Sequence, residues 1–191
     1  MKTLKTRVSV VLLLPLMIIM FSKAAFGHDL VFPAEKLKIL FPAAESFEQK
    51  NLYLSDDQRA RIEKQTKSRL PEEDLKPSVY LAIVRKTPDS ALSKAAVILF
   101  VDALGAGGKI EIGIVINGKG ELLKVHIFEN NESEKLSQQA FLKQFEGKKL
   151  TDPFKTGTDI TSPAGTENTT QAIASGVQRG LLIISEIFRK K

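Results

Sequence analysis

The strongest local pattern in the sequence lies between residues 108 and 129. Isoleucine occupies every second position from 110 to 116, which is the period of a β-strand with one strongly apolar face. Asn117-Gly118 follows at once, and this dipeptide favours a hairpin turn. The pattern therefore predicts a hairpin whose return strand covers 122–129. On that return strand, strict alternation places Leu123, Val125 and Ile127 on one face and Leu122, Lys124, His126 and Phe128 on the other.

Segments on both sides of the hairpin complete an α+β pattern. Apolar runs at 79–84 and 95–101 predict two more strands. Helical spacing predicts helices over 137–145 and 169–188, which would pack on the sheet. The buried stripe of the last helix is expected to be Ile173, Val177, Leu181, Ile184 and Phe188, and Gly176 and Gly180 lie one turn apart, where they would allow another backbone to approach closely.

The region before the sheet predicts a helical extension. Helical spacing in 34–41 ends at Pro42, and Ser55 with Gln58 resembles a capping box for a helix that continues to Arg69. The expected fold is α+β, with a twisted antiparallel sheet, packed helices and an N-terminal helical extension. The expected organisation is a signal peptide at 1–27, the extension at 28–77 and one domain at 78–191.

The first 27 residues predict a secretory signal peptide. Basic residues at 2, 5 and 7 precede an apolar stretch from Val8 to Phe21, and small residues then lead to a cut before His28. The stretch is shorter than the roughly 20 residues that span a bilayer, and an uncleaved anchor is the alternative. We therefore expect an extracytoplasmic protein, with the periplasm as the expected compartment.

Charge and cysteine content exclude several classes of protein. The predicted signal holds four of the 28 basic residues and no acidic one, which leaves 24 basic against 22 acidic residues. The high pI is thus largely a property of the signal, and nucleic-acid binding is not expected. The chain has no cysteine, which excludes disulfides, iron–sulfur clusters and thioether-attached haem. With two histidines in the chain, no metal site built from histidines is expected.

Segment 151–175 carries the strongest chemical signal. It gathers Thr, Ser and Gly residues in a loop that opens the last predicted helix. Free backbone N–H groups and the positive end of the helix dipole favour a phosphate at such a position. Hydroxyl residues at a helix start also serve as ordinary caps, so the segment by itself leaves both interpretations open.

The order of the segments resembles a known family. A glycine-rich hairpin at 107–129, a helix that ends in Gln-Phe-Glu-Gly-Lys-Lys, an Asp-containing hydroxyl-rich loop and an alanine-containing helix follow one another. This order is similar to the FMN-binding domain family, found in the flavin subunits of ion-pumping quinone reductases and Rnf-type complexes. The resemblance covers residues 78–188.

The family's attachment motif aligns with the start of the last helix. In the family, FMN is joined through its phosphate to a Thr or Ser that follows Asp, two residues, a small residue, Gly-Ala-Thr and one further residue. Thr169 falls on the acceptor position, and Gly165 falls on the glycine. Thr166 stands where the family has Ala, and Asp159 lies two residues further upstream than the motif places its Asp. Counting forward from Asp159 instead puts Ser162 on the small position and Pro163 on the glycine.

A second family motif aligns after the hairpin. The family has Glu-Thr-Pro-Gly-Leu-Gly there, whereas this chain has Glu132-Ser133-Glu134-Lys135-Leu136-Ser137, so that both glycines are replaced. The resemblance implies that Thr169 carries the phosphate. It also implies that Thr170, Gly165 and Thr166 line the phosphate and that Glu132 and Ser133 lie near the flavin ring or ribityl chain.

The resemblance implies a function as well. The expected function is an exported flavoprotein that carries electrons with FMN and converts no substrate, so no catalytic residue is expected. Its expected partners are a redox protein or a membrane electron-transfer complex, together with a flavin transferase that attaches FMN. One alternative is a cofactor-free binding or structural module that keeps the FMN-binding fold. Another is a copper site formed by His28, its terminal amine and His126.

Overall fold

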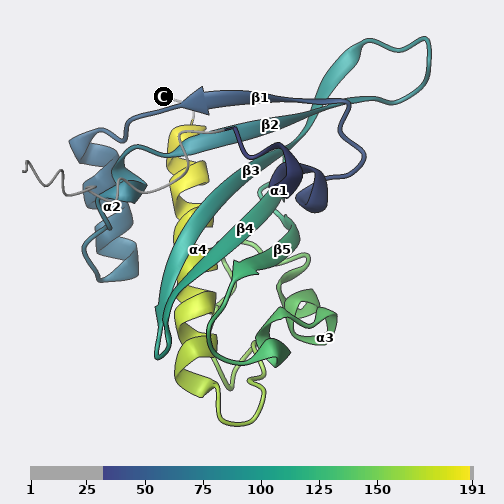
Figure 1. Ribbon diagram of the computed structural model, residues 1–191. Coiled ribbons are helices and arrows are strands. Elements are labelled where there is room, and N and C mark those ends of the chain that lie inside the picture. The colour runs from purple at the N-terminus through teal and green to yellow at the C-terminus, as the bar shows by residue number, and fades with distance from the viewer. Residues whose placement is uncertain (1–31, 190–191) are drawn as a thin grey trace, which may run out of the picture.

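The sheet is the centre of the molecule. The computed structural model describes residues 32–189. They form a five-stranded sheet, and Figure 1 shows its twist. Its strands lie in chain order and every neighbouring pair is antiparallel. This arrangement confirms the predicted α+β class. The strands are β1 (Ser46–Asn51), β2 (Ser78–Arg85), β3 (Leu92–Gly105), β4 (Gly108–Asn117) and β5 (Leu122–Glu129).

Four α-helices surround the sheet, and three 3-10 turns join them to it. The helices are α1 (Ala34–Leu40), α2 (Asp56–Thr66), α3 (Gln139–Leu142) and α4 (Glu167–Ile187), and the turns cover Glu73–Leu75, Glu134–Ser137 and Lys143–Phe145. The helix predicted over 137–145 is thus a single α-turn flanked by tighter turns. Its three predicted inward residues, Phe141, Leu142 and Phe145, are buried.

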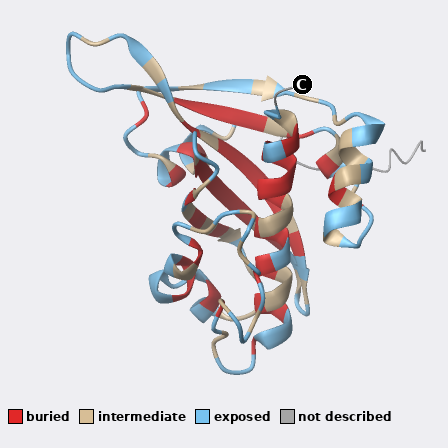
Figure 2. Cartoon of the chain, turned by 180° about the vertical axis from the view of Figure 1, so that it is seen from behind, coloured by how far each residue is buried: buried red, intermediate tan, exposed pale blue. Residues whose placement is uncertain are grey.

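Helix α4 covers one face of the sheet. It packs against β3 and β4, and Figure 2 shows the buried residues along the contact. Gly180 makes this contact possible, because a Cβ there would lie 2.5 Å from Ile114 Cδ1 and 3.1 Å from Val101 Cγ1. The predicted stripe is buried from Ile173 to Ile184, but Phe188 is 49% exposed because it follows the last helical turn.

The opposite face of the sheet carries a smaller core under α1. Leu37 and Leu40 of α1 are buried there. Gly113 on β4 leaves room for both α1 and an aromatic ring, since a Cβ there would lie 2.7 Å from Leu40 Cδ1 and 2.8 Å from Phe128 Cε2. Four aromatic rings follow one another across this face: Phe32, which precedes α1, and then Tyr80, Phe100 and Phe128 of β2, β3 and β5.

The register of β5 differs from strict alternation. A bulge interrupts the β4–β5 ladder between Val115 and Ile116, so Leu122 pairs with Ile116 and is buried. Leu123 is 41% exposed, and the prediction that it shares the inner face with Val125 was therefore wrong. A bulge inserts one extra residue and reverses the side-chain alternation beyond it.

The N-terminal region is helical, and it also completes the sheet. The capping box at Ser55 is present, but α2 ends at Thr66, with Lys67 in a left-handed conformation, rather than at Arg69. Residues 46–51, expected within a helical extension, instead form the edge strand β1. The predicted signal peptide lies outside the described residues. Within residues 32–189, no helix has both the length and the apolar character needed to cross a membrane.

Candidate functional site

The start of α4 follows from its upstream turn. Gly165 has a φ of +80°, a conformation that glycine adopts without strain. Thr166 is the N-cap residue; its carbonyl accepts from Thr170 N at 2.7 Å, and its hydroxyl donates to Pro163 O at 2.8 Å. The Thr166 hydroxyl therefore stabilises the turn before the helix, and it accepts no capping hydrogen bond from a backbone N–H of the helix.

Thr169 lies in the first turn of α4 with a buried side chain. It is 2% exposed, and its hydroxyl donates to Glu132 Oε2. Glu132 belongs to the loop after β5, so two segments separated by 37 positions meet here. The family resemblance implied that both residues lie at one site, through two separate motifs, and in the fold their side chains are in contact.

The other oxygen of Glu132 is held by the β3–β4 turn. Gly107 N donates to Glu132 Oε1 at 2.9 Å. Glycine is needed nearby, because a Cβ at Gly105 would lie 2.0 Å from this oxygen and a Cβ at Gly107 would lie 2.7 Å from Glu132 Cγ. The Glu132 backbone N–H donates to Asn130 Oδ1 at 2.9 Å. The carboxylate is thus fixed from two sides, with one oxygen directed to Thr169.

The other predicted site residues do not bind the Glu132 carboxylate. Thr170 is fully buried, and its hydroxyl lies 3.3 Å from that of Thr166, so these two threonines contact each other rather than Glu132. Gly165 lies exposed in the turn before α4. Ser133 accepts from Lys135 N and caps the turn over Glu134–Ser137. The direct contact at this site is therefore the pair Thr169 and Glu132.

Asp159 anchors the loop that leads to α4. Its carboxylate accepts from Lys148 Nζ at 2.8 Å, Lys155 N at 2.7 Å and Phe154 N at 3.2 Å. Burial by itself would raise the pKa of Asp159, but the hydrogen bonds from these three donors hold it below its ordinary value. Asp159 thus shapes the loop that carries the candidate motif.

Sequence reasoning missed the residues that position Glu132. Gly105, Gly107 and Asn130 lie at or beyond strand ends, where the sequence read only as turns. Gly105, Gly107 and Gly108 are typical of a turn, but no periodic pattern predicts which side chain occupies the space beside a glycine. Contact between the turn and the 130–133 loop depends on how β3, β4 and β5 align.

The Glu132 carboxylate is held by hydrogen-bond donors and not by basic side chains of the described range. No ion pair joins Glu132 to a basic residue of the described range. Its partners are the Gly107 N–H in the β3–β4 turn and the Thr169 hydroxyl in the first turn of α4. At the start of a helix the dipole favours negative charge. A carboxylate thus occupies the place that favours a phosphate, and a phosphate on Thr169 requires Glu132 to shift or to become neutral.

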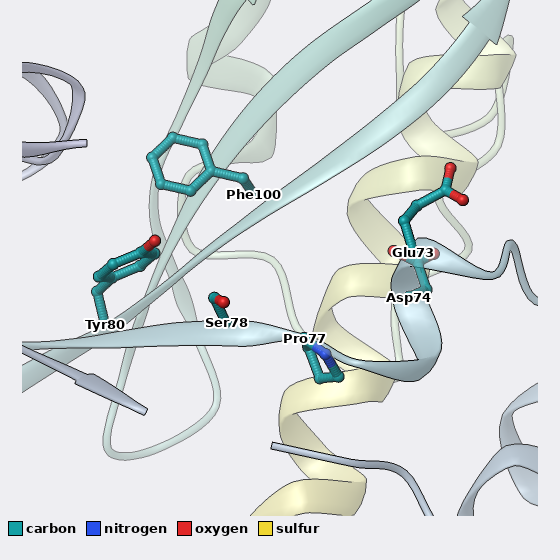
Figure 3. A pocket seen from close by; sticks show the side chains of 6 residues that line it. All are labelled: Glu73, Asp74, Pro77, Ser78, Tyr80 and Phe100. Atoms are coloured by element: carbon teal, nitrogen blue, oxygen red, sulfur yellow. The ribbon is translucent and has the colours of Figure 1, made fainter. Parts of the chain in front are cut away.

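Two hollows lie away from this pair. One is a cavity of about 20 Å³, enough for a single water. Figure 3 shows the side chains that line it, Glu73, Asp74, Pro77, Ser78, Tyr80 and Phe100. One of these lining residues, Asp74, is 4% exposed and forms an ion pair with Arg179 Nε at 2.6 Å. An open groove of about 450 Å³ lies at the far end of α4, beside Leu81, Val97 and Phe188.

The copper hypothesis involves His28 and His126. His28 lies outside the described residues. His126 is half-buried and its ring meets that of Phe128 at a centroid distance of 4.6 Å. Burial, and then the charge of Lys124, lower the pKa of His126. Among residues 32–189, no group of three His, Cys, Asp or Glu side chains is placed to hold a metal ion.

Comparison with known proteins adds no relative. No family model matches the chain, and no curated protein matches it. The resemblance to the FMN-binding domain family therefore rests on the motifs quoted above.

Proposed function

We propose that this protein is an exported electron carrier that holds FMN through a phosphoester on Thr169. The observation that carries the proposal is the contact between the Thr169 hydroxyl and Glu132. The family resemblance assigned these residues to one flavin site through separate motifs, and they lie side by side. FMN supplies the redox chemistry, and the protein supplies attachment and surroundings.

The residues around Thr169 have distinct roles in this proposal. Thr169 forms the covalent link, and the N–H groups in the first turn of α4 face the phosphate. Thr166, Thr170 and Gly165 shape the turn that exposes those groups, whereas Glu132 and Ser133 lie on the opposite loop. The partners are a flavin transferase and a redox protein or membrane electron-transfer complex in the periplasm.

A second function is favoured by one specific observation. Thr169 is 2% exposed and Glu132 covers its hydroxyl. A protein that keeps this closed arrangement permanently would be a cofactor-free binding or structural module. The two functions differ in whether the hydroxyl of Thr169 becomes accessible to a transferase.

In-gel flavin fluorescence tests the proposal. The full precursor is expressed in a host that has a flavin transferase, and the processed protein is separated on a denaturing gel and imaged under ultraviolet light. We expect a fluorescent band that disappears in Thr169→Ala and persists in Thr170→Ala, a matched control one residue away and equally buried. A wild-type band that is dark, together with a colourless native protein, would reject the flavin proposal in favour of the cofactor-free module.

A further inference from the structure

The hydroxyl of Thr169 needs a proton acceptor in order to react. A threonine hydroxyl is a weak nucleophile, and proteins activate such groups with an adjacent general base. Here the hydroxyl already donates its hydrogen bond to Glu132 Oε2. A general base must lie within hydrogen-bond reach of the proton that it removes, and Glu132 meets this requirement before any other group binds.

The surroundings direct Glu132 to this one partner. Gly107 N holds its Oε1 at 2.9 Å, which leaves Oε2 for the Thr169 hydroxyl. No lysine or arginine of the described range forms an ion pair with it. The carboxylate is thus oriented by a neutral donor and is not already committed to a cation.

Neighbouring acceptors are directed elsewhere. Glu167, the nearest acidic residue in sequence, accepts from Gly165 N at 3.3 Å. The Thr166 hydroxyl contacts Pro163 O and the Thr170 hydroxyl. Among the hydrogen bonds of residues 32–189, Glu132 supplies the acceptor for Thr169 Oγ1.

We propose that Glu132 is the catalytic base for flavin attachment at Thr169, an inference that rests on the proposed function. The donor is a flavin dinucleotide, in which the phosphate of FMN is one half of a phosphoanhydride. The Thr169 oxygen forms a bond to the phosphorus of the FMN half, and the anhydride P–O bond breaks. The nucleoside monophosphate leaves with the electron pair, the hydroxyl proton moves to Glu132 Oε2, and nothing is oxidised or reduced.

The same proton transfer resolves the conflict of charges at the site. An ionised Glu132 beside a phosphate would be repelled by it. After it accepts the proton, Glu132 is neutral and its carboxyl group can donate a hydrogen bond to a phosphate oxygen. One residue thus covers Thr169 in the unmodified protein, activates it and then accommodates the product.

The test compares rates of flavin attachment to purified, unmodified protein. FAD and the flavin transferase of the expression host are added, and attachment is followed by in-gel fluorescence and intact mass. We expect Glu132→Gln to slow attachment by about 10²–10⁴-fold, the usual range for loss of a general base. The amide oxygen can still accept from Gly107 N, so the local fold is kept. Glu134→Gln, which changes an exposed carboxylate two residues away, should react at the wild-type rate.

Two further variants distinguish a catalytic base from a side chain that only shields the Thr169 hydroxyl. Glu132→Asp should restore part of the rate, and added formate should accelerate Glu132→Ala, because a small carboxylate can replace the missing base. If Glu132 only shields the hydroxyl, the opposite result is expected. Glu132→Gln and Glu132→Ala would then be modified as fast as the wild type or faster, and formate would have no effect. Such rates would overturn the inference and leave the proposed function standing, whereas a wild type that takes up no flavin would overturn both.

Discussion

The two ends of α4 have contrasting surroundings. At its N-terminal end, the hydroxyls of three buried threonines form hydrogen bonds, one of them to the half-buried Glu132 carboxylate. At its C-terminal end, apolar side chains line an open groove of about 450 Å³. The helix has 21 residues and is therefore about 30 Å long. The groove beside Phe188 is thus not the place for a group attached to Thr169.

The contrast teaches that attachment chemistry and open volume are separate in this fold. The polar end offers a nucleophile and an acceptor in contact, but a closed surface. The apolar end offers space, and its lysines, Lys50 and Lys94, both pair with Glu48. A function that depends on a covalent link belongs to the first end.

The largest effect is expected in the middle of α4. Arg179→Met leaves the nearly buried Asp74 without the guanidinium that lies 2.6 Å away, which should lower the free energy of unfolding by about 3–5 kcal/mol. Arg61→Met is the matched control toward the C-terminal end. Arg61 pairs with the equally buried Glu186, but Arg61 is 42% exposed and Arg189 also pairs with Glu186, so its loss should change stability by at most about 1 kcal/mol. Urea unfolding measures both, and equal effects would show that neither the exposure of the arginine nor the second partner of Glu186 distinguishes the pairs.

The second prediction concerns the glycines of α4. Alanine at either position gains the same helix propensity, but a Cβ at Gly180 lies 2.5 Å from Ile114 Cδ1, whereas a Cβ at Gly176 has its closest contact at 3.4 Å. Gly180→Ala should therefore be less stable than Gly176→Ala by about 1–3 kcal/mol. Thermal unfolding of the two variants side by side checks this. Equal stability would mean that the Ile114 side chain rotates away freely.

The third prediction concerns the polar end. Because the pKa of Asp159 is lowered, its carboxylate stabilises the fold above the ordinary value of 3.8, and this contribution is lost as the pH falls through the lower folded pKa. Asp159→Asn should lower the free energy of unfolding by about 1–2 kcal/mol at neutral pH. The difference from wild type should narrow below pH 3.8. Chemical denaturation at several pH values measures it, with exposed Asp89→Asn as the control; a gap that persists in acid would contradict the assignment.

The smallest effect is expected at the apolar end. Phe188 is 49% exposed at the rim of the groove, so Phe188→Ser should change the free energy of unfolding by less than about 0.5 kcal/mol. It should leave flavin attachment at Thr169 unchanged. The same fluorescent gel measures flavin attachment in Phe188→Ser. Loss of attachment would contradict the conclusion that the two ends of α4 act separately.

Local patterns in the sequence anticipated most elements of the fold. The isoleucine alternation and Asn117-Gly118 predicted β4 and its turn, and the apolar stripe from Ile173 to Ile184 predicted α4. The errors have one kind of cause. The bulge beside Ile116 and the pairing of β1 with β2 depend on neighbouring strands, and no local period reports them.

The candidate site divides in the same way. Residue type and local spacing could be taken from the chain directly, and they predicted the two chemical groups, a threonine at the start of a helix and a glutamate after a hairpin. Tertiary structure alone decided that the two side chains meet, that Gly107 orients the carboxylate and that Asp159 anchors the loop before the helix. The physical reason is that these contacts join segments far apart in sequence, and their distances are set by how α4 packs on the sheet and how the strands align.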